Sequence, residues 1–186
     1  TSYIPTNGES GGVTRAAESA TGSGDASTFN DSEGVLFADI AALEDSTIQR
    51  WISVGSGSNA NRVSILFNAT NRIKCSVRGS SAAIYDAFGN IGNQTQVSKS
   101  AVKYKDSDFS FFVNGFKVDS QQSGSVSFNA PLSELSFDSA DGESDFYGKT
   151  KQIQYYNSAL TDSELEELTS WVSFTDMAEA QLYSVE

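Results

Sequence analysis

The sequence predicts an all-β jelly-roll sandwich with one short helix near its C-terminal end. Two observations carry this prediction. Apolar and polar residues alternate along many short segments, and turns rich in Gly, Asn, Asp and Ser separate these segments. A helical spacing of apolar residues, in contrast, stands out at one place only. The length of 186 residues fits a single domain over 1–186.

A β-hairpin over 62–78 is the clearest predicted element. Its first arm buries Val63 and Ile65, and its second arm continues the same alternation through Cys75 and Val77 after a short polar turn. A period of two on both arms predicts an antiparallel pair with one buried face. Further strands are predicted at 35–40, 48–54, 83–88, 100–105, 109–114, 116–119, 126–128, 132–137 and 152–156, with an edge strand at 180–185.

The two ends of the sequence differ from its middle. Residues 1–30 are rich in Gly, Ser and Thr and have few apolar anchors, so we expect an extended segment that wraps around the domain. Thr161 and Glu164 form a capping pattern ahead of Leu165 and Leu168, which predicts the short helix. The sequence opens without Met or a charged-then-apolar leader, which is typical of the C-terminal piece of a longer protein.

The composition excludes several kinds of site. The chain has no histidine, so neither a Ser-His-Asp triad nor an imidazole ligand for zinc is available. The lone Cys75 can form no intrachain disulfide. With 24 acidic against 12 basic residues the net charge is −12, and the apolar runs are short. We therefore expect no nucleic-acid partner and no membrane association.

Two stretches resemble a known family. The segment 145–165 forms a strand and then turns through Asn157-Ser158-Ala159-Leu160 into the predicted helix, which is similar to the C-terminal signature of concanavalin A-like, laminin-G-type lectin domains. The segment 109–115 resembles the hairpin of the same family, including its Val-Asn-Gly turn. The resemblance implies a concanavalin A-like jelly roll.

The N-terminal part points more narrowly. Residues 1–6, 14–18 and 33–37 resemble laminin-G-like modules of phage tail fibres and tailspikes, although an Asp is more usual where Glu18 stands. This resemblance implies a glycan-binding or adhesion role on a virion tail or elsewhere outside the cell. Because members of the family differ widely in ligand, the fold alone does not fix the function.

The distribution of charge predicts a binding surface. Between Ala60 and Lys105 there are seven basic residues and a single acid, Asp86, so this segment carries +6 while the rest of the chain carries −18. The basic residues that share the outward phase of the hairpin are Arg62, Arg72, Lys74 and Arg78. Such a basic stripe favours anionic sugars, whose carboxylates or phosphates match the guanidinium fork. The alternative interpretation is that these side chains only protect the sheet from edge pairing.

Two aromatic residues are candidates for stacking on a sugar ring. Trp51 shares the more polar phase of its strand, and Tyr85 precedes a Gly-Asn turn. Flat aromatic rings cover the apolar face of a pyranose, but an aromatic side chain in a β-sandwich is equally able to fill the core. Both residues are included in the predicted ligand-binding site.

The acidic loop 138–145 is a candidate for a calcium site and for a catalytic site. Asp138, Asp141, Glu143 and Asp145 offer oxygen ligands of the kind that calcium prefers, although the spacing is not that of an EF-hand. Glu143 and Asp145 also match the first half of a Glu-x-Asp-x-x-Glu glucanase motif, but no third acid follows at that spacing. We therefore expect no catalytic residues and no obligatory cofactor.

Together these observations predict a non-catalytic carbohydrate-binding module. The expected ligand is a bacterial surface polysaccharide or another glycan, and the expected setting is the receptor-binding domain of a phage tail fibre or tailspike, with a homotrimer within the fibre as a further expectation. Two alternatives stay open: an accessory carbohydrate-binding module of a secreted polysaccharide-degrading enzyme, and a structural trimer-forming tip without a glycan ligand.

Overall fold

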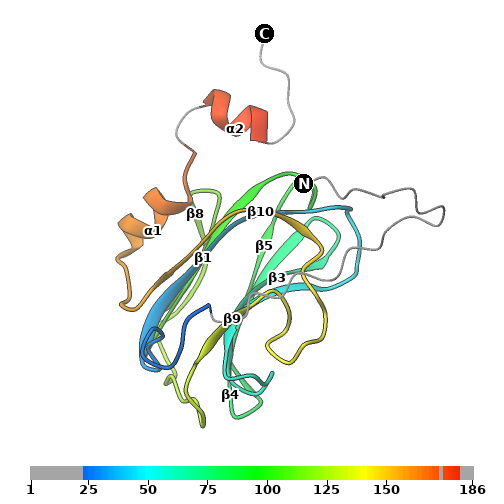
Figure 1. The fold of residues 1–186 in the computed structure, drawn as a ribbon. Coiled ribbons are helices and arrows are strands. Elements are labelled where there is room, and N and C mark those ends of the chain that lie inside the picture. The colour runs from blue at the N-terminus through cyan, green and yellow to red at the C-terminus, as the bar shows by residue number, and fades with distance from the viewer. Residues whose placement is uncertain (1–22, 172–173, 181–186) are drawn as a thin grey trace, which may run out of the picture.

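The computed structural model describes residues 23–171 and 174–180 and shows two antiparallel sheets packed face to face (Figure 1). The first sheet has the order β10 (Gly148–Tyr156), β1 (Glu33–Ala42), β6 (Ser98–Lys105), β7 (Phe109–Val113) and β8 (Phe116–Gln121). The second sheet has the order β5 (Ala82–Asn90), β4 (Arg72–Gly79), β3 (Arg62–Ala69), β2 (Arg50–Gly55) and β9 (Glu134–Ser136). The predicted all-β sandwich is confirmed.

The core lies between the two sheets and follows the predicted alternation. In the hairpin β3–β4, Ile65 lies opposite Cys75 and Val63 opposite Val77, and all four side chains are fully buried. Their outward neighbours form the other face of the second sheet. The predicted hairpin is therefore confirmed, and its register decides which side chains are available to a ligand.

One predicted strand is wrong. Residues 126–128 form no strand, although Val126 and Phe128 still pack against the core. The reason is that side chains take the place of a neighbouring strand: the amide of Val126 donates to the carboxylate of Asp106, and that of Asn129 donates to the side chain of Asn61. Burial of apolar side chains does not by itself form a strand when the backbone amides are bonded to side chains instead of to a neighbouring strand.

The chain ends differ in part from expectation. Of the N-terminal segment expected to wrap the domain, residues 1–22 lie outside the described residues, and Phe29 enters the core with its ring edge-on to Tyr155. The edge strand expected at 180–185 also lies outside the described residues apart from Ala180, which ends a second helix, α2 (Phe174–Ala180), that the sequence did not predict. Among the described residues, every helix is too short or too polar to cross a membrane.

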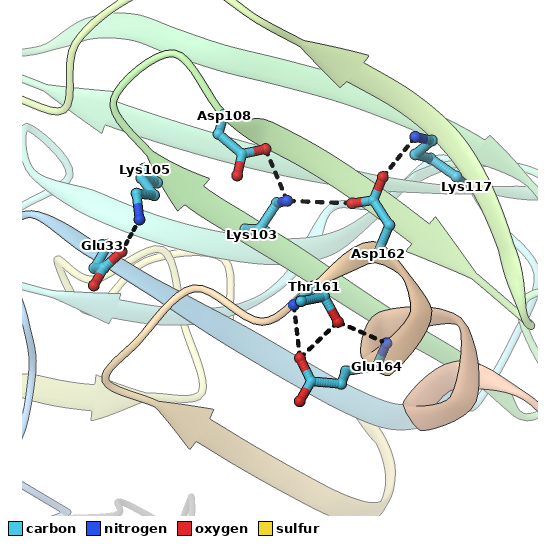
Figure 2. Close-up of polar contacts among 8 residues, drawn as sticks. All are labelled: Glu33, Lys103, Lys105, Asp108, Lys117, Thr161, Asp162 and Glu164. Carbon is cyan, nitrogen blue, oxygen red and sulfur yellow. Dashed lines mark hydrogen bonds and ion pairs between the residues drawn. The ribbon is translucent and has the colours of Figure 1, made fainter.

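The predicted helix is confirmed as α1 (Asp162–Thr169), and Figure 2 shows how it begins. Thr161 accepts a hydrogen bond from the amide of Glu164, whose carboxylate accepts one from the amide of Thr161 in return. This capping box satisfies two amides that a helix start otherwise leaves unpaired. Leu165 packs beneath the helix against Phe37 and the rest of the apolar outer face of the first sheet.

Buried Lys103 of β6 joins α1 to the first sheet (Figure 2). Its ammonium group lies 2.7 Å from Asp108 and 3.2 Å from Asp162, and Asp162 also pairs with Lys117 at 2.7 Å. The hydrogen bonds from Lys117 and Lys103 hold the pKa of Asp162 below its usual 3.8. Ion pairs between residues of the chain itself therefore hold the start of α1 against the first sheet.

We expect the Asp162→Asn variant to be less stable than the parent at pH 7, by roughly 1 kcal/mol or less because Asp162 is about half exposed. A carboxylate whose folded-state pKa is depressed stabilises the fold above its unfolded pKa and loses that contribution as the pH falls through the folded value. The difference in unfolding free energy, measured in urea, should therefore shrink below pH 4. A constant difference at all pH values, or the same loss in the exposed Glu167→Gln control on the same helix, would contradict this assignment.

Candidate ligand-binding face

The outer face of the second sheet presents its side chains in rows that run across the strands. One row contains Trp51, Leu66, Lys74 and Phe88, which lie opposite one another in β2, β3, β4 and β5. The next row contains Ser53, Ser64, Ser76 and Asp86, and the row beyond it contains Arg62 and Arg78. Because the serines of the middle row are smaller than the side chains of the two flanking rows, the outer surface of the sheet is recessed along that row. We call this surface the binding face.

A hollow of about 320 Å³ lies on the binding face. The residues that line it are Gln49, Trp51, Asn59, Arg62, Leu66, Asn68, Lys74 and Arg78. Among the described residues this lining contains three cations and no carboxylate, in a chain of net charge −12. Asp86 pairs with Lys74 and Asp141 accepts a hydrogen bond from Asn59, so the arginines are the part of the lining best suited to an anionic ligand.

Trp51 and Arg62 form a stacked pair at one wall of the hollow. The guanidinium carbon of Arg62 lies 4.3 Å from the centroid of the Trp51 ring, and the indole nitrogen donates a hydrogen bond of 3.2 Å to Gln49. Trp51 is only 7% exposed and Arg62 only 6%. The indole therefore serves mainly to hold the guanidinium in place and offers little surface to a ligand.

Arg62 and Arg78 lie directly opposite each other in the β3–β4 pair. One terminal nitrogen of Arg62 donates to the carbonyl of Ser139 at 2.8 Å, and one of Arg78 donates to the carbonyl of Ser81 at 3.2 Å. The Nε atoms of both arginines are buried and have no hydrogen-bond partner within the described part of the chain. Burial, together with the nearby charge of Arg78, lowers the pKa of Arg62.

This pair of arginines has the properties of an anion site. Two guanidinium groups that repel each other are stabilised when an anion is bound between them. The buried Nε atoms and the buried hydroxyl of Ser76 are out of reach of a ligand. A carboxylate bridging Arg62 and Arg78 would accept bonds from their terminal nitrogens, of which each arginine uses one on a backbone carbonyl.

Lys74 and Arg72 extend the positive surface toward β5. Lys74 forms an ion pair of 3.0 Å with Asp86, and the Nε of Arg72 donates to Asn68 at 3.1 Å. Both cations lie over the ring of Phe88, at 4.6 Å for Arg72 and 5.3 Å for Lys74. Lys74 therefore belongs both to the hollow and to the surface around Phe88, whereas Arg72 lies beside the hollow.

Of the predicted ligand-binding residues, four line the hollow: Trp51, Arg62, Lys74 and Arg78. Tyr85 does not reach this face. Its side chain is 2% exposed and packs in the core with its ring 5.5 Å from Phe109. Tyr85 lies opposite the inward Val77 and on the same phase of β5 as buried Ala87, so its selection as a stacking platform is corrected.

Phe88 is the aromatic residue of this strand that does lie on the binding face, and sequence reasoning missed it. The signal was present, because Asp86 marks the outward phase of β5 and Phe88 is two residues further on. Three more basic residues of the same segment, Lys99, Lys103 and Lys105, lie on β6 in the other sheet. The expected single basic region is therefore divided between the two sheets.

The acidic loop 138–145 contacts residues of the binding face but does not line the hollow. Its carbonyl groups accept hydrogen bonds from Ser53 at Asp138 and from Arg62 at Ser139. The carboxylate of Asp138 accepts bonds from Ser136 and Ala140, and the structure gathers no group of three or more His, Cys, Asp or Glu side chains for a metal ion in the ranges it describes. The four candidate calcium ligands are thus not brought together, and the calcium prediction gains no support from their arrangement.

A β-sandwich with a hollow, cationic sheet face has the form of a lectin-like domain. The family model described as the concanavalin A-like lectin/glucanases superfamily matches residues 40–166, so the chain belongs to this superfamily. The predicted family resemblance is confirmed. No match was found among curated protein sequences.

Solved structures with a similar fold include modules and larger enzymes. The CBM40 of an IT-sialidase from Ruminococcus gnavus, bound to α2,3-sialyllactose, is 16% identical with a TM-score of 0.62, and the match covers 75% of this chain and 83% of that one. A leech intramolecular trans-sialidase gives a TM-score of 0.63 at 16% identity, over 78% of this chain and 24% of the enzyme. The NanB sialidase of Streptococcus pneumoniae gives 0.61 at 16% identity, over 78% and 25%. At this identity the likeness establishes a shared fold.

Proposed function

We propose that the chain is a non-catalytic carbohydrate-binding module that binds acidic glycans through the binding face. The observation that carries this proposal is the pair Arg62 and Arg78, opposed on adjacent strands and lining a hollow. A sugar carboxylate accepts hydrogen bonds from their terminal nitrogens, and the polar side chains of Gln49 and Asn68 in the lining suit sugar hydroxyls. The similarity to a module bound to sialyllactose, an acidic glycan, supports the same ligand class.

The charge of the rest of the molecule supports the same ligand class. A chain of net charge −12 repels an acidic polymer except where its positive face is presented. Productive encounters therefore occur through Arg62, Arg78 and Lys74, and affinity should fall as salt screens these charges. Glycoside hydrolysis uses a pair of carboxylates beside the bond that is cleaved, and the residues of the hollow that the structure describes include no such pair, which is consistent with a binding role.

We expect the purified chain to bind 3′-sialyllactose and to bind lactose at least about tenfold more weakly. Calorimetric titration at low and at high salt measures both affinities, and acidic polysaccharides with uronic acids or phosphates on a glycan array test the wider class. The difference between acidic and neutral glycans should shrink as salt is added. Binding to neutral glycans as strong as to every acidic glycan on the array would contradict the proposal.

The larger protein in which the module works is part of the same proposal. The N-terminal resemblance favours the receptor-binding domain of a phage tail fibre or tailspike that recognises a bacterial surface glycan, with a homotrimer to raise the avidity of weak single sites. The similarity to sialidase modules favours the accessory module of a secreted glycan-degrading enzyme. Binding to intact bacteria that disappears when their surface polysaccharide is removed, and a trimer by light scattering, would support the tail-fibre setting. A monomer that binds isolated host glycans would support the enzyme setting.

A further inference from the structure

We propose that Phe88, with Arg72 and Lys74, forms a second sugar subsite, so that the ligand is an acidic oligosaccharide of at least two residues. This inference rests on the proposed function, and it concerns a part of the binding face outside the hollow. Phe88 is 47% exposed on β5, in the same row as Trp51 and Lys74. Phe88 is therefore an open aromatic surface on the same sheet face as the arginine pair.

The distance between Phe88 and the arginine pair sets the length of the ligand. Phe88 lies opposite Lys74, four residues along β4 from Arg78, and a strand rises ~3.3 Å per residue, so the two sites are roughly 13 Å apart along the strand. A single pyranose ring is shorter than this span. A sugar whose carboxylate binds between Arg62 and Arg78 therefore leaves Phe88 free for the next residue of the same glycan.

The chemistry around Phe88 suits a second acidic sugar. An exposed phenyl ring covers the apolar face of a pyranose, and Arg72 and Lys74 lie 4.6 Å and 5.3 Å from its centroid. Lys74 also lines the hollow, so the two subsites are continuous. Asp86 is already paired with Lys74, and Arg72 is a cation beside Phe88 that can bind a second carboxylate.

A purely structural role makes a different prediction. If Phe88 only supports the two cations, its removal changes the stability of the chain or weakens all ligands alike. If it forms a subsite, its removal weakens long ligands and leaves short ones unchanged. The length of the ligand therefore separates the two roles.

The experiment titrates the parent and the Phe88→Ala variant with N-acetylneuraminic acid and galacturonic acid, each as the monomer and as the trimer. For the parent we expect one trimer to bind roughly tenfold more tightly than its monomer, equivalent to about 1.4 kcal/mol. Phe88→Ala should bind that trimer only as well as the monomer, with monomer affinity unchanged. The matched control is Phe116→Ala, which removes a 74% exposed phenyl ring from β8 in the other sheet and should bind like the parent.

Each other outcome is decisive. Equal affinity of the parent for monomer and trimer, or an unchanged trimer affinity in Phe88→Ala, overturns the second subsite and leaves the proposed function standing. A parent that binds neither series overturns the proposed function, and this inference with it. If Phe88→Ala does not fold, Phe88→Leu takes its place, because it keeps the apolar volume and removes the flat ring.

Discussion

Replacing Arg62 and Arg78 together with Gln is expected to lower the affinity for an acidic glycan by at least roughly 100-fold. Each hydrogen bond to a charged group contributes about 1.5–3 kcal/mol, and the terminal nitrogens of the two guanidinium groups can both donate to one carboxylate. The effect exceeds that of ordinary surface ion pairs because Arg62 is almost fully buried, where charges are screened less by water. Calorimetric titration with 3′-sialyllactose measures the loss.

Matched variants separate the binding role from net charge and from folding. Lys149→Gln with Lys151→Gln removes the same two charges from exposed positions on β10 of the other sheet and should leave affinity within about twofold. Arg78→Lys keeps the charge and loses the planar fork, so an intermediate loss is expected. A folded double variant of Arg62 and Arg78 that binds as tightly as the parent would show that the site is wrong.

Phe67→Ala is expected to reduce the free energy of unfolding by about 3–5 kcal/mol. Phe67 is fully buried in β3, with its ring 6.3 Å from that of Phe146, and it lies in the strand between Leu66 and Asn68 of the hollow. Truncation removes apolar burial and leaves a cavity directly beneath the binding face. Urea unfolding followed by circular dichroism measures the change, which is a large share of the stability of an ordinary domain.

The comparison for this variant is again Phe116→Ala, whose exposed ring should change stability by no more than about 0.5 kcal/mol. A loss below about 1 kcal/mol for Phe67→Ala would mean that the core beneath the binding face is not packed as the structure shows. A large loss in both variants would point to a general effect of removing phenylalanine.

The sequence predicted the elements that are determined by residues close together in the chain. The hairpin β3–β4 follows from unbroken alternation on both arms, and α1 follows from the capping box of Thr161 and Glu164. The same alternation placed Arg62, Lys74 and Arg78 on one outward face, where the structure has them. These features depend only on the period of a strand or on the first turn of a helix.

The remainder depends on contacts between distant residues. The inward side chain of Tyr85 is an exception, because the local alternation with outward Asp86 and Phe88 already indicates it. Charge density along the chain does not show that Lys99 to Lys105 belong to the other sheet, where Lys103 binds the start of α1. The stacking of Arg62 on Trp51 requires two strands to lie side by side in the correct register.

The most direct test of the binding face compares 3′-sialyllactose with its methyl ester, on the parent and on the single variant Arg78→Gln. Esterification removes the charge of the ligand and little else, so the preference for the acid reports the contact between carboxylate and arginine. The account predicts that the parent prefers the acid by at least roughly tenfold and that Arg78→Gln loses most of this preference. A parent that binds acid and ester equally, or a variant that keeps the full preference, would contradict it.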